Sequence, residues 1–185
     1  MNKLIKLPLF LGVVGCLCGG VLALTNFVTE DKIKKDEDAR ANAAYIAHFS
    51  NLAHRKDAET LSDTLTAGGV VLKSYAYDAS NKYIGTIYTI SASGYAGKQN
   101  PIKFTVSFAN GKPYHYVELG HGESSQGAAF MNWLKGDTNG DRLSNLEAGK
   151  TQTGSSVTYG AVSKAVSTCL TDYMAEYQNV PDYTE

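Results

Sequence analysis

The sequence of 185 residues contains little cysteine, proline or tryptophan, and it has no excess charge of either sign. Its three cysteines, which include the neighbouring pair Cys16 and Cys18, do not form a disulfide framework. Four prolines and the lack of any low-complexity tract exclude a largely disordered chain. Seventeen basic against eighteen acidic side chains exclude a strongly cationic protein, so no nucleic acid is expected as a partner. The length suits one domain of ordinary size.

Charge is absent from one long segment near the N-terminus. No charged residue lies between Leu7 and Thr29, and the run from Leu9 to Leu24 is almost entirely apolar. A helix of about 20 such residues spans the hydrocarbon core of a bilayer. We therefore expect residues 1–30 to form a single-pass anchor in the cell membrane. Because few residues precede the run, the N-terminus is expected in the cytoplasm and the C-terminal domain outside it.

Two other interpretations of this segment remain open. Val13-Val14-Gly15-Cys16 resembles a bacterial lipobox, in which Cys16 would be lipidated. A cleaved signal peptide would have a shorter apolar region and a small-residue cleavage site. The apolar run continues well beyond Cys16, which favours the uncleaved anchor.

The remainder of the chain predicts an α+β fold made of antiparallel hairpins and flanking helices. Residues 31–66 are rich in Ala, Lys, Asp and Glu, and they predict a helical linker before a domain over residues 67–185. Apolar alternation and β-branched residues predict strands over Val70–Ala76, Tyr83–Ser91, Ile102–Ala109 and Tyr114–Leu119. Asp78–Lys82 and Asn110-Gly111 are the turns between paired strands.

The C-terminal part predicts two helices with a polar loop between them. Ser124–Leu134 is the first helix, and Gly136–Lys150 is the loop. Apolar residues then repeat at helical spacing from Val157 to Tyr177, which predicts a long amphipathic helix. Twelve tyrosines all follow residue 40, so they belong to the part expected outside the membrane.

The segment from Thr153 to Thr158 lies where this last helix begins. Ser and Thr there are typical helix caps, because their oxygens accept hydrogen bonds from unpaired N–H groups. The same N–H groups, together with the helix dipole, favour binding of a phosphate. The segment alone therefore leaves a helix cap and an anion site open.

The order of motifs along the chain resembles a known family. After the apolar segment, the motifs are Gly94-Tyr95-Ala96-Gly97, Pro101-Ile102, Glu123-Ser124-Ser125 and finally Thr153-Gly154-Ser155-Ser156-Val157-Thr158. This order resembles the FMN-binding domain family, which includes the flavin-carrying subunits of the Rnf electron transport complex and of the related Na⁺-translocating NADH:quinone reductase. The short chain and the single apolar segment are more similar to the Rnf protein.

The resemblance implies that FMN is bound covalently through its phosphate. The family motif is Ser/Thr-Gly-Ala-Thr, and its last hydroxyl residue receives FMN from FAD through a dedicated flavin transferase. Matched to this motif, Thr153 and Gly154 agree, Ser155 replaces Ala, and Ser156 replaces the acceptor Thr. Ser156 is therefore the expected attachment residue, and Thr158 is the fallback.

Two further residues are expected to contribute to a flavin site. Tyr95 is expected to pack against the flavin ring, although many such tyrosines are half-buried surface residues. Glu123 is expected to order the loop near the flavin, with a solvated turn carboxylate as the alternative. Gly94 and Gly97 would permit close approach of the backbone to the ring, or they serve an ordinary loop.

The resemblance implies an electron-carrier subunit rather than a self-contained enzyme. Its partners would be the other membrane subunits of a ferredoxin:NAD oxidoreductase that translocates ions. Two alternatives remain: a stand-alone anchored or lipidated flavoprotein of extracellular electron transfer, and a flavin-free binding or structural module of the same fold.

A metal site is not expected. Asp137, Asn139, Asp141 and Glu147 are spaced somewhat like calcium ligands, but Arg142 stands where an EF-hand loop has its glycine. A polar loop is the favoured interpretation, with calcium as the alternative. The four histidines have no metal-ligand spacing. No catalytic residue is expected.

Overall fold

The structure, a computed structural model, describes residues 43–137, 140–146 and 155–184, which belong to the compact unit Asn42–Glu185. The predicted anchor over residues 1–30 lies outside the described residues, as does the predicted linker up to residue 42. Among the helices that the structure describes, none is long and apolar enough to cross a membrane.

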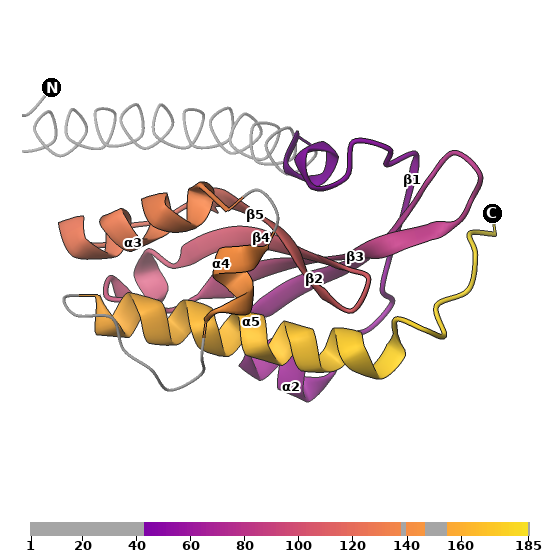
Figure 1. Cartoon of the computed structure of the whole chain (residues 1–185). Coiled ribbons are helices and arrows are strands. Elements are labelled where there is room, and N and C mark those ends of the chain that lie inside the picture. Colours follow the sequence, from indigo (N-terminus) through magenta and orange to yellow (C-terminus); the bar gives the residue numbers. More distant parts are fainter. Residues whose placement is uncertain (1–42, 138–139, 147–154, 185) are drawn as a thin grey trace, which may run out of the picture. The chain divides into compact units, whose positions relative to one another are not determined.

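The fold is α+β, as predicted, and is built on a five-stranded antiparallel sheet whose spatial order follows the chain (Figure 1). The strands are β1 (His54–Asp57), β2 (Val70–Tyr77), β3 (Tyr83–Ala92), β4 (Ile102–Ala109) and β5 (Lys112–Gly120). The helices are residues 43–48, α2 (Asp63–Ala67), α3 (Ser125–Lys135), α4 (Asp141–Ser144) and α5 (Ser156–Glu176), with a short 3₁₀ turn at Gly97–Gln99.

The hairpin turns were predictable because they contain Asn and Gly, which adopt left-handed backbone conformations more readily than other residues. Asn110 and Gly111 have φ values of 52° and 77°, so both lie in the left-handed region that a two-residue hairpin requires. Asp78–Lys82 closes the earlier hairpin, with the Asp78 N–H donating to the Lys82 carbonyl at 2.9 Å. The predicted pairing of the strands on either side of both turns is confirmed.

Two short elements contradict the predictions. His54–Asp57 is the edge strand β1, not a helix; all four side chains are exposed, and Arg55 pairs with Ala76 of β2. Pairing with β2, rather than any apolar pattern of its own, makes this segment a strand. Asp141–Ser144 forms the helix α4 inside the predicted polar loop, because the buried Asp137 carboxylate accepts the Leu143 N–H at 2.8 Å.

The main core lies between one face of the sheet and the helices α3, α4 and α5. Alternate residues of β4 point to this face and are fully buried: Ile102, Phe104, Val106 and Phe108. The helices contribute Phe130, Met131, Leu134, Leu143, Val162, Ala165, Val166, Cys169 and Tyr173. The predicted apolar stripe of α5 is thereby confirmed, and Figure 1 shows α5 lying against the sheet.

The opposite face of the sheet is covered by the helix of residues 43–48. His48 is only 2% exposed, and its Nε2 lies 2.7 Å from Thr105 Oγ1 on β4. Its ring contacts that of His115 edge-on, with the centroids 5.3 Å apart. Burial and the nearby His115 lower the pKa of His48 to about 3. The native state therefore holds this imidazole neutral.

Stability is expected to fall as the pH falls from 6.5 toward 3. The unfolded chain protonates His48 near pH 6.5, whereas the folded chain resists protonation, so acid favours unfolding. The loss from this residue amounts to about 2 kcal/mol between pH 6.5 and 5. Urea unfolding at several pH values measures it. His48→Gln should remove this part of the pH dependence; an unchanged profile in that variant would contradict the assignment.

An ion-pair cluster around a buried lysine joins α5 to β2. Lys73 on β2 is 4% exposed, and its Nζ lies 2.5 Å from Asp172 Oδ2 and 2.6 Å from Glu176 Oε1, both on α5. The Tyr88 hydroxyl donates to the same Asp172 oxygen at 2.7 Å. Burial alone would lower the pKa of Lys73, but the bonds to the two carboxylates outweigh it and raise that pKa. Lys73 is therefore charged in the fold.

Replacing Lys73 with Met should destabilise the protein by about 3 kcal/mol, because two carboxylates of α5 then face each other without their cation. Lys164→Met is the matched control: Lys164 is an exposed lysine on α5, so its loss should cost less than about 1 kcal/mol. Urea unfolding of both variants gives the comparison. Equal losses would show that the cluster does not hold α5.

Candidate functional site

Three segments far apart in the sequence meet at a pocket of about 220 Å³. They are the loop after β3, the first residues of α3 and the start of α5. The lining residues are Tyr95, Ser124, Gln126, Ser155, Ser156, Val157 and Thr158. Four residues predicted for a flavin site, Tyr95, Ser155, Ser156 and Thr158, therefore line one pocket.

The start of α5 lines this pocket with the first turn of a long helix. Ser155 occupies the capping position, but its side chain makes no capping hydrogen bond. Its carbonyl accepts the Tyr159 N–H at 2.8 Å, which begins the helix. The N–H groups of the first turn have no partner inside a helix, and they carry the positive end of its dipole. An anion is thus the ligand that this helix end favours.

Ser156 and Thr158 differ sharply in accessibility. Ser156 is exposed, and its hydroxyl makes no hydrogen bond within the part of the chain that the structure describes. Thr158 is 2% exposed, and its hydroxyl donates to Glu123 Oε2. A group attached to Thr158 would require that bond to break and the side chain to leave the interior. Ser156 is therefore the better acceptor for a covalent group.

Glu123 lies beside the pocket and contacts two of its three segments. Its Oε2 accepts the Tyr95 N–H at 3.1 Å in addition to the Thr158 hydroxyl, and its Oε1 accepts the Ala96 N–H at 3.4 Å. These three donors partly balance the negative charge of the carboxylate. The loop after β3 and the first turn of α5 are thereby tied to one side chain.

Two glycines leave the space that Glu123 occupies. A Cβ on Gly94 would collide with Glu123 Oε1, and a Cβ on Gly127 would lie 2.8 Å from Thr158 Oγ1 and 2.9 Å from Glu123 Cβ. Gly97 serves a different purpose, because its φ of +70° is in the left-handed region. The glycine of α3 is thus part of the site.

Some predicted features fall outside this pocket or outside the described residues. Thr153 and Gly154 lie outside the described residues, as do Asn139 and Glu147 of the calcium alternative. The Asp137 Oδ2 atom accepts the Leu143 N–H. Among the described residues, no group of three His, Cys, Asp or Glu side chains is placed to hold a metal.

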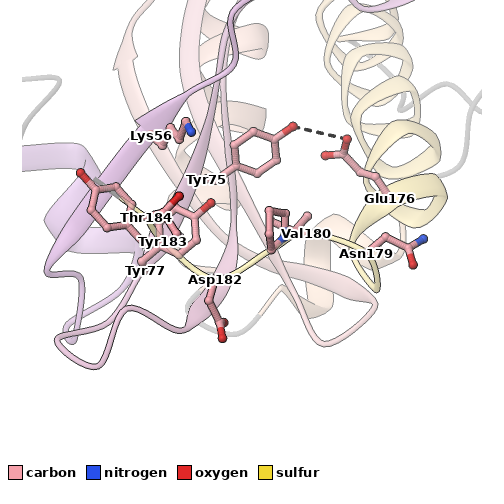
Figure 2. A pocket seen from close by; sticks show the side chains of 10 residues that line it. Lys56, Tyr75, Tyr77, Glu176, Asn179, Val180, Asp182, Tyr183 and Thr184 are labelled. Atoms are coloured by element: carbon pink, nitrogen blue, oxygen red, sulfur yellow. Dashed lines mark hydrogen bonds between the residues drawn. The ribbon is translucent and has the colours of Figure 1, made fainter.

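A second pocket, of about 250 Å³, lies under the C-terminal segment (Figure 2). Tyr75, Tyr77 and Tyr183 contribute to its walls, and the Tyr75 hydroxyl donates to Glu176 Oε2 at 3.4 Å. Lys56 and Asp182, which carry opposite charges, are also among the residues that line it. Glu176 ends α5, whereas Ser156 begins it, so about 30 Å of helix separates the two pockets. No residue predicted for a flavin site lies here.

Comparison of the chain with protein-family models, with curated protein sequences and with solved structures finds no match.

Gly127→Ala should destabilise the protein by about 1–3 kcal/mol, because the new methyl group meets Thr158 and Glu123 in a packed space. Gly160→Ala on α5 is the matched control, since a Cβ there meets nothing within 4 Å. Removing a glycine from a helix interior then stabilises by about 0.5–1 kcal/mol. Thermal unfolding distinguishes the two. A stabilising Gly127→Ala would contradict the packing described.

Proposed function

We propose that this chain carries FMN covalently on Ser156 and transfers electrons within an Rnf-type, ion-translocating ferredoxin:NAD oxidoreductase, as one of its subunits. The observation that carries the proposal is the pocket in which an exposed serine hydroxyl, the N-terminal end of a long helix and an exposed tyrosine ring come together. These features come from the motifs on which the resemblance to the FMN-binding family rests.

The residues of the pocket suit the phosphate end of FMN. First-turn N–H groups of α5 would hold the phosphate oxygens, and the helix dipole would favour their charge. The volume of about 220 Å³ is smaller than that of pockets enclosing a whole drug-sized ligand. The phosphate and the adjoining chain would therefore occupy the pocket, while the ring would remain accessible to partner proteins. Tyr95 and Val157, which are 72% and 53% exposed, supply non-polar surface at its rim.

The attachment chemistry requires a hydroxyl that a transferase can reach. Ser156 Oγ would form a bond to the FMN phosphorus of FAD, the pyrophosphate bond would break, AMP would leave, and the serine proton would pass to solvent. The hydroxyl of Ser156 is exposed and makes no hydrogen bond within the described residues, so this step displaces no contact seen there. Thr153, Gly154 and Ser155 would complete the motif that the transferase recognises.

Bound FMN supplies one-electron and two-electron redox chemistry, which the polypeptide alone lacks. The chain would bind it, orient it and hold it at the membrane through the anchor proposed at residues 1–30. A covalent bond suits a carrier domain outside the cytoplasm, where released FMN would be lost. The neighbouring membrane subunits would be its electron donor and acceptor.

Covalent labelling tests the proposal. The full chain is co-expressed with a flavin transferase, denatured, and examined for flavin fluorescence in the gel band, and the modified peptide is located by mass spectrometry. We expect the label on Ser156, with Ser156→Ala abolishing it because the acceptor oxygen is lost. Thr158→Val tests the fallback residue and should retain the label on Ser156.

Two outcomes would contradict this prediction. An unlabelled wild-type chain, under conditions that label a known substrate of the transferase, would exclude covalent FMN and favour a flavin-free module. A label lost in Thr158→Val but kept in Ser156→Ala would move the attachment site to Thr158. A labelled chain that purifies without partner subunits would instead favour the stand-alone flavoprotein.

A further inference from the structure

We propose that Glu123 is a positioning residue: its carboxylate fixes the Tyr95 loop to the first turn of α5 and thereby holds the Tyr95 ring at the mouth of the pocket. The inference rests on the proposed function, since the ring matters only if a ligand is bound there. It assigns Glu123 a role without contact to that ligand.

The hydrogen bonds of Glu123 connect segments that lie far apart in the sequence. Tyr95 N–H and Ala96 N–H come from the loop after β3, while the Thr158 hydroxyl comes from α5. Bonds to an ionised acceptor are stronger than bonds between neutral groups. Because one carboxylate accepts all three, the loop and the helix start are held at a fixed separation.

The backbone around Glu123 is itself held in place. The Glu123 N–H donates to His121 Nδ1 at 3.1 Å, and the next residue, Ser124, caps α3 through its hydroxyl at 3.4 Å from the Gly127 nitrogen. Gly94 and Gly127 leave room for the carboxylate on either side. A methyl group at either glycine would therefore collide with the Glu123 side chain.

Tyr95 is the residue on which this arrangement acts. Tyr95 is 72% exposed and its ring stacks on no other ring among the described residues, yet its backbone N–H is bonded to Glu123. The backbone hydrogen bond, and not stacking of the ring, therefore positions Tyr95 in the pocket that Ser156 also lines. Loss of the carboxylate would free the loop and let the ring move away from the pocket.

Hydrogen exchange of the full chain without flavin tests the positioning directly. Glu123→Gln keeps the size of the side chain and one acceptor oxygen but removes the charge. We expect the peptide containing Tyr95 and Ala96 to exchange about tenfold faster than in the wild type, as the loss of hydrogen bonds to a charged acceptor implies. Glu59→Gln removes the same charge from an exposed residue and should leave that peptide unchanged. Equal exchange in Glu123→Gln and the wild type would overturn the proposal.

The flavin-loaded protein gives a second measurement. A tyrosine held against a flavin ring quenches its fluorescence, so Tyr95→Leu should brighten the bound flavin, and Glu123→Gln should brighten it as well. The double variant should be no brighter than Tyr95→Leu alone, because both changes remove the same contact. Additive brightening, or no brightening by Glu123→Gln, would overturn the proposal.

Gly94→Ala and Thr158→Val keep the experiment decisive if Glu123→Gln folds poorly. The first displaces the carboxylate without removing its charge, and the second removes a single donor, so both should speed exchange of the Tyr95 peptide. Thr171→Val is the control on α5, since the Thr171 hydroxyl bonds only within its own helix, to the Ser167 carbonyl at 2.9 Å.

A wild-type chain that takes up no flavin would overturn the proposed function, and with it any role of Glu123 in positioning a ring for a flavin. The exchange rates would still show whether Glu123 orders the loop.

Discussion

The place of Ser156 depends on how α5 is held against the sheet, and the ion pairs of Lys73 fix one point of that contact. Apolar burial favours contact between helix and sheet but is not directional, so it permits some rotation and sliding. Rotation or sliding of α5 would separate the buried Lys73 ammonium from Asp172 and Glu176, which is costly. Since a helix is rigid, fixing Asp172 also fixes Ser156, about 24 Å away along the helix axis.

Much of the sheet was predictable because its signals are local. Ile102, Phe104, Val106 and Phe108 alternate along one strand, and Asn110-Gly111 directly after them specifies a tight turn. The elements that escaped prediction depend on distant partners. β1 is a strand because β2 offers it hydrogen bonds, and α4 forms where the Asp137 carboxylate caps a short turn. Neither cause is visible in the residues of the element itself.

The candidate site divides in the same way. Hydroxyl residues at the start of a long amphipathic helix indicated an anion site, and Tyr95 and Glu123 came from the resemblance of motif order. What the sequence did not indicate is that Glu123 bonds to Thr158 and to the Tyr95 loop, or that Gly127 on α3 makes room for it. The burial of His48 was not predictable either, since its contact with Thr105 depends on a helix packing across the sheet. Such contacts join residues far apart in the sequence, which helical or strand periodicity does not relate.

The charged character of β1 has a consequence for association between copies of the chain. β1 ends the sheet, and no strand of the described part pairs with its outer edge. An open edge is a template for adding strands from other chains, and charged side chains on it oppose such growth. His54, Arg55, Lys56 and Asp57 place ionisable groups along that edge. Copies of the chain concentrated on a membrane by the proposed anchor would thus be protected from fusing into continuous sheets.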